Sequence, residues 1–232
     1  MYPYHQELPR WLWLWLPFLF LAFLLIVNLI DQAFFQKWIQ SEQGLVELAT
    51  PLVLAFGMVY GARIPAAGRL YLPVWIRLWV IAVALACFYF AGEELSWGQQ
   101  LFGWSTPESV GRINDQNETN IHNVSSWFDQ KPRLLLELWV LIGGVILPAL
   151  RIWKNDHLIP GSWQYWFLPA SLCLPSALIA ILIKIPERIK DVFGLSPFSY
   201  EIRWSEAQEL YFAAFLSLYL ASIYARLRQR DA

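Results

Sequence analysis

The sequence contains few cysteines, few histidines and few charged residues. Of its 232 residues, 2 are cysteine, 3 are histidine and 15% are charged, with a net charge of −1. Cys87 and Cys173 both fall in apolar segments, so we expect reduced, packed thiols and neither a disulfide nor a thiolate metal site. The near-zero net charge excludes the basic footprint of a nucleic-acid-binding protein.

Apolar residues, by contrast, dominate the chain. Hydrophobic residues make up 57% of it and aromatic residues 17%, including 14 tryptophans, and the mean hydropathy is +0.40. This composition is too apolar for a soluble domain of this size. Six windows approach the ~20 residues that a membrane-spanning helix needs: 11–30, 45–61, 74–92, 134–150, 163–185 and 207–226. The sequence therefore predicts an all-α, polytopic transmembrane bundle in a single membrane domain, 1–232.

Basic residues are distributed unevenly between the two predicted faces of the bundle. With six spans, one face carries both termini and two short loops, and these hold Arg10, Arg63, Arg69, Arg77, Arg151, Lys154, Arg226, Arg228 and Arg230. Basic residues concentrated in short loops mark the cytoplasmic side. We therefore predict that both termini are cytoplasmic and that the long loop 93–133 is extracytoplasmic.

Acidic residues gather where the predicted outward loops meet the spans. These positions, with one histidine, are Glu42, Glu47, Glu93, Glu94, Glu118, His122, Glu206 and Glu209. They are distant in sequence but share one predicted depth, and carboxylate metal sites in helical bundles are assembled from such residues. An ionisable residue at membrane depth is costly to desolvate and indicates a site.

The spacing of these residues suggests individual roles. Glu118 and His122 are four apart, and Glu206 and Glu209 are three apart, so each pair shares a helical face. The side chains of the adjacent Glu93 and Glu94 diverge by roughly 100° on a helix. One can therefore face the bundle while the other supports it as a neighbouring carboxylate or general base. We predict Glu94, Glu118, His122 and Glu206 as metal ligands, with Glu93 as the general base. Glu42, Glu47 and Glu209 are further candidates.

Oxygen ligands with one imidazole suit Zn, Mn, Fe or Mg, and a metal-bound water is a usable nucleophile near neutral pH. Ser96 is a second catalytic candidate. Trp97, Gln99, Asn114, Gln116, Asn120 and Asn123 are predicted to bind the substrate. Trp97, Trp104 and Trp127 also suit the headgroup level of a membrane.

Structural roles compete with these functional ones. Ser41–Glu42 and Ser205–Glu206 look like helix caps followed by a first-turn acid, and Ser205 with Gln208 completes a capping-box pattern. Glu47 lies past the first turn of a helix capped by Ser41, so helix capping explains it less well. Ion pairing would give Glu93 or Glu94 a partner in Arg112 or Arg203, and would join Arg133 to Glu137 locally. His122 would then serve as a hydrogen-bonding residue and not as a ligand.

Two of these segments together resemble a known signature. Residues 92–99 (GEELSWGQ), followed by 114–123 (NDQNETNIHN), are similar to the paired signature of a group of uncharacterised bacterial multi-pass membrane proteins, which also show an acid-Gly-x-x-Glu stretch like 42–47. The resemblance implies a bacterial inner-membrane protein and supports the choice of residues. Intramembrane metalloproteases that process prenylated proteins also use a Glu-Glu pair, but their Arg four residues later is Gly98 here, and their two further histidines are missing.

Two functions fit this pattern. The first is a metal-dependent hydrolase or transferase that acts on a membrane lipid or lipid-linked substrate at the outer leaflet. The second is not enzymatic: a transporter, or an assembly subunit with a membrane-protein partner, whose acidic mouth binds cations or that partner. Transporters use helices broken at mid-depth, and Pro169, Pro175 and Gly143–Gly144 keep this second function open.

Overall fold

The computed structural model describes residues 8–41, 44–106, 126–194 and 204–230. These residues form helices and no strands. Six segments of them are long and apolar enough to cross a membrane: Trp11–Ile30, Leu45–Ala67, Val74–Glu94, Lys131–Trp153, Trp163–Lys190 and Trp204–Arg230. The predicted all-α fold and the six predicted spans are confirmed, and most spans extend a few residues beyond their predicted ends.

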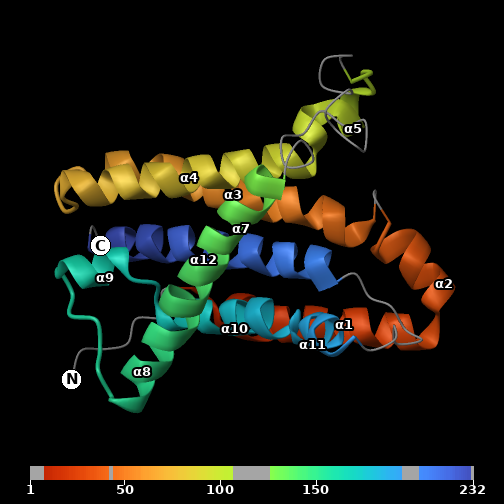
Figure 1. The fold of residues 1–232 in the computed structure, drawn as a ribbon. Helices are drawn as coiled ribbons and strands as arrows, with labels where there is room; N and C mark the ends of the chain where they lie inside the picture. Colours follow the sequence, from red (N-terminus) through yellow and green to blue (C-terminus); the bar gives the residue numbers. More distant parts are fainter. Residues whose placement is uncertain (1–7, 42–43, 107–125, 195–203, 231–232) are drawn as a thin grey trace.

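The first span consists of a π-helical segment, η1 (Trp11–Trp15), and the α-helix α1 (Leu16–Ile30). Asp31 ends α1 with an extended backbone, and its side chain accepts a 2.9 Å hydrogen bond from the Phe34 N–H. This bond caps α2 (Gln32–Phe34), which continues as η2 (Phe35–Ile39) and leads the chain to the next span. Figure 1 shows this connection at one end of the bundle.

Helices α3 (Leu45–Ala67) and α4 (Val74–Glu94) pack side by side, and α3 also lies against α12 (Trp204–Arg230). Glycine makes the first contact possible. A Cβ added at Gly61 would lie 2.6 Å from the Ala84 Cβ, so the missing side chain lets the two backbones approach.

The fourth span crosses the bundle diagonally as α7 (Ser126–Trp139), η5 (Val140–Ile146) and α8 (Leu147–Trp153) (Figure 1). Gly144 lies in the π-helical segment η5, where an added Cβ would be 2.6 Å from the Phe215 ring and 2.7 Å from the Ala177 Cβ. Close packing against α10 (Leu174–Leu182) and α12 therefore accounts for this glycine, and the span stays helical across it.

The fifth predicted span, 163–185, lies within the span Trp163–Lys190, but this span is broken and is not one continuous helix. The chain forms α9 (Trp163–Phe167), η6 (Ser171–Cys173), α10 (Leu174–Leu182) and α11 (Ile185–Phe193). The break falls around Pro169, whose ring cannot donate a backbone hydrogen bond and disfavours a helical residue before it.

Side chains from other spans satisfy the carbonyl groups that this break frees. Arg226 donates to the Tyr165 carbonyl, the Tyr219 hydroxyl donates to that of Phe167 at 2.8 Å, and Arg151 donates to that of Pro169 at 3.0 Å. Since a buried backbone acceptor without a partner is costly, these three side chains stabilise the irregular segment at membrane depth.

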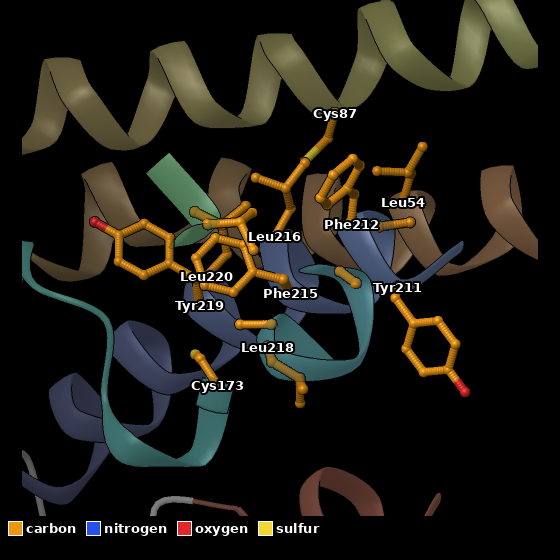
Figure 2. Packing of buried hydrophobic residues seen from close by; sticks show 14 of the residues in the cluster. Leu54, Cys87, Cys173, Tyr211, Phe212, Phe215, Leu216, Leu218, Tyr219 and Leu220 are labelled. Carbon is orange, nitrogen blue, oxygen red and sulfur yellow. The ribbon is translucent and has the colours of Figure 1, made fainter. Parts of the chain in front are cut away.

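Helix α12 is the centre of the bundle. Within its most apolar stretch 83% of residues are buried, against 17–33% for the first four spans. Figure 2 shows its side chains Phe212, Phe215 and Leu216 packed among residues of neighbouring helices, with Leu54 and Cys87 on one side and Cys173 on the other. Both cysteines are free and buried, as predicted.

Candidate functional site

Four of the predicted acidic residues meet at one end of the bundle, where α4 ends and α3 and α12 begin. The charge of Glu94 is under the electrostatic influence of Glu47 on α3, Glu206 and Glu209 on α12, and Arg133 on α7. We call these five residues the acidic mouth. Four helices thus contribute to one polar cluster at the end of an otherwise apolar bundle.

Arg133 connects α7 to α12 in the acidic mouth. Its Nη1 donates to Glu209 Oε1 at 2.9 Å, and its Nη2 donates to Gln208 Oε1 at 2.8 Å. The buried Gln208 in turn donates from Nε2 to the Ala180 carbonyl of α10 at 2.9 Å. A planar guanidinium suits such a two-point contact, so Arg133 fixes α7 against α12 at the mouth.

These contacts correct two structural expectations. Arg133 binds Glu209 on α12, whereas Glu137 pairs with Arg188 of α11, so the predicted local pair of Arg133 with Glu137 is wrong. The capping box is also wrong, because Ser205 already lies inside α12 and the Gln208 amide joins α7 to α10. Tertiary partners across the bundle have replaced the partners nearest in sequence.

The start of α3 differs from its prediction as well. Gly44, with an extended backbone, is the N-cap residue, so Ser41 does not cap this helix. Glu47 consequently lies in the first turn of α3 and not beyond it. There it complements the positive end of the helix dipole while also facing Glu94.

The adjacent Glu93 and Glu94 diverge as predicted. Glu94 interacts with the carboxylates of the acidic mouth, whereas Glu93 is 5% exposed and accepts a 2.6 Å hydrogen bond from the Trp97 indole. The Trp97 ring lies against Gly92, where an added Cβ would come within 2.9 Å of it. Gly92 therefore leaves space for the ring that positions Glu93.

The chain after α4 turns through a strained segment. Ser96, Trp97 and Gly98 of η3 (Ser96–Gly98) have φ values of 45°, 55° and 97°. Non-glycine residues in this left-handed region cost on the order of 1–3 kcal/mol each, and such strain clusters at functional sites. The turn leads into α5 (Gln99–Phe102), where Gln99 donates to Thr106 Oγ1 at 3.0 Å. Ser96 itself is 1% exposed, so its side chain is buried in this turn.

Replacing Trp97 by phenylalanine should lower the stability of this segment. The change keeps a ring beside Gly92 but removes the donor to the buried Glu93, and hydrogen bonds to charged groups contribute about 1.5–3 kcal/mol. We expect a lower apparent unfolding temperature in detergent. Trp104→Phe is the control, since Trp104 stacks on Phe102 near the surface. Equal effects of the two changes would contradict a positioning role for the indole.

The remaining predicted site residues lie outside the described part of the chain: Glu42, Asn114, Gln116, Glu118, Asn120, His122 and Asn123. Arg112 and Arg203 lie outside it too. Within the described residues, no three His, Cys, Asp or Glu side chains form a group that could hold a metal ion. The predicted ligand set, which needs Glu118 and His122, therefore remains a prediction.

The sequence interpretation missed Arg133 and Gln208 as members of this site. Arg133 did carry a signal, because a cation placed immediately before an apolar span faces the same depth as the acids. Comparison with protein-family models, with curated proteins and with solved structures finds no match to this chain.

Proposed function

We propose that this integral membrane protein binds a divalent cation at the acidic mouth and uses it to hydrolyse or transfer the headgroup of a lipid or lipid-linked substrate. One observation carries the proposal. Of the described residues that act on the charge of Glu94, three are carboxylates and one is a guanidinium. Like charges that act on one another in a partly desolvated site are unfavourable unless a cation or protons are taken up.

In this scheme Glu94 and Glu206 are ligands, and Arg133 orients Glu209 beside them. Glu93 is the general base, with its carboxylate oriented by the Trp97 indole. A bound divalent cation supplies Lewis acidity and lowers the pKa of a coordinated water. The site lies at the end of a span, the depth at which lipid headgroups meet the protein. Glu118 and His122 are the predicted remaining ligands.

The first test is metal content. Protein purified without chelator and analysed for metals should carry one divalent ion per chain. Removing it with EDTA should lower the apparent unfolding temperature, and adding Mn²⁺ or Zn²⁺ should restore it, because a ligand that binds the folded state stabilises it. The control is EDTA-treated protein in Mg²⁺-free buffer to which Na⁺ is added at equal ionic strength in place of the divalent ion. A chain that neither contains metal nor responds to these ions would contradict the proposal.

A cation-coupled transporter is the second candidate function, and the break in the fifth span favours it. Three carbonyl groups at this break accept hydrogen bonds from Arg226, Tyr219 and Arg151. Transport of a cation past the break therefore requires these hydrogen bonds to break and re-form. Reconstituted vesicles distinguish the candidates. Transport predicts cation-dependent flux across the bilayer, whereas the enzyme predicts metal-dependent release of a headgroup without flux.

A further inference from the structure

Helix α11 presents its apolar side away from the protein. Ile185, Ile189, Val192 and Phe193 are exposed by 39%, 45%, 77% and 71%, respectively. These four residues fall on one side of the helix, because positions three or four apart share a face. We call them the apolar side of α11.

The polar side of the same helix faces the protein. Glu187 and Lys190 are half-buried, and the Glu187 Oε2 atom is fully buried. An amphipathic helix at a water-exposed surface has the opposite orientation, since the hydrophobic effect drives its apolar side into the protein. The inverted orientation indicates that an apolar phase lies against the outward side of α11.

The neighbouring elements identify that phase. Helix α11 begins three residues after α10 ends at Leu182, so it continues the fifth span. The ion pair of Arg188 with Glu137 holds it against α7. Next to Glu137, the α7 side chains Leu134, Leu135 and Leu138 are exposed by 50%, 72% and 45%. The apolar side of α11 therefore extends the lipid-facing surface of a spanning helix.

We propose that the apolar side of α11 is embedded in the lipid leaflet at the acidic end of the bundle, at the boundary between acyl chains and headgroups. The partner is lipid and not a second protein. A basic residue, Lys184, lies at the N-cap of the helix. A lysine side chain is long enough to reach lipid phosphate groups from a helix at this depth. The proposal does not depend on metal binding at the acidic mouth.

Site-specific quenching tests the position of α11. A bimane label is attached to Ile189→Cys or Val192→Cys in full-length protein whose buried Cys87 and Cys173 are replaced by serine. Leu135→Cys on α7 is the lipid-facing reference, and Asp156→Cys in an exposed loop is the aqueous reference. The protein is reconstituted as one copy per nanodisc. Lipids carrying a nitroxide on the acyl chain and dissolved iodide are the two quenchers.

We expect the nitroxide lipid to quench labels at 189 and 192 within about twofold of the label at 135, and iodide to quench only the label at 156. Iodide quenching at 189 equal to that at 156 would place α11 in water and overturn the proposal. If the labels were protected from both quenchers in nanodiscs that hold two copies of the protein, but not in nanodiscs that hold one, the partner of α11 would be a second chain and not lipid. This quenching result does not depend on whether the acidic mouth binds metal. The proposal for α11 and the proposed function can therefore fail independently.

Discussion

Replacing Glu94 by glutamine should abolish metal binding and leave the bundle folded. Glutamine keeps the shape and most hydrogen-bonding capacity of the side chain but removes its negative charge. Because burial and three other carboxylates disfavour a charge on Glu94, a neutral amide is tolerated there, and the metal-free protein should be no less stable than the parent. Metal analysis and the apparent unfolding temperature of the detergent-solubilised protein, measured side by side, check both expectations.

Glu137→Gln is the matched control for this change. Glu137 is a carboxylate near the same end of the bundle, but its partner is Arg188 and it does not belong to the acidic mouth. We expect this variant to keep its metal. If Glu94 were instead half of a structural ion pair, Glu94→Gln would destabilise the protein by roughly 3–5 kcal/mol. A Glu94→Gln variant that unfolds easily but retains its metal would show that Glu94 is not a ligand.

Arg226→Met should cause a large loss of stability at the opposite end of the bundle. Arg226 is 1% exposed, donates to the Tyr165 carbonyl and to Ser222 Oγ, and lies 4.8 Å from the centre of the Tyr165 ring. Methionine fills part of the space but donates no hydrogen bond. Hydrogen bonds to charged groups contribute about 1.5–3 kcal/mol, and 1 kcal/mol shifts the unfolding temperature by about 2–4 °C in a chain of this size. We therefore expect a fall of roughly 5 °C or more.

Arg228→Met serves as the control for Arg226→Met. Arg228 lies two residues further along α12 and is exposed, so the same chemical change there should shift stability by less than about 0.5 kcal/mol. Hydrogen exchange at α9 provides a second measurement, since loss of the Arg226 contact should increase exchange locally. Similar unfolding temperatures for the two variants would mean that the break in the fifth span is held by Tyr219 and Arg151 alone.

The spans could be predicted because they depend on local composition. Each of the six windows is apolar over a bilayer-length stretch, and a helix is the structure that satisfies the backbone of such a segment in lipid. The ends were less predictable. The fifth span reads as one apolar run, yet Pro169 interrupts it. The interruption is stabilised by Arg151, Tyr219 and Arg226, which reach it from two other helices.

The acidic mouth was predictable in part for the same reason. Topology places the ends of α3, α4 and α12 at one depth, so Glu47, Glu94, Glu206 and Glu209 were expected near one another. Their partners were not predictable, because Arg133 has Glu137 one turn away and still binds Glu209 on another helix. The tilt of α7 across the bundle decides that choice.

By itself the sequence determined that this protein is a helical membrane bundle, and it showed where its spans and most of its acids lie. These properties follow from hydrophobicity and chain direction, which each segment carries independently of its neighbours. The tertiary structure alone decided that α12 is the central helix, that Glu93 pairs with Trp97 while Glu94 faces the mouth, and that α11 presents its apolar side outward. Those outcomes depend on helix rotation and tilt, which are set by close packing at positions such as Gly61 and Gly144 and leave no periodic signal in the sequence.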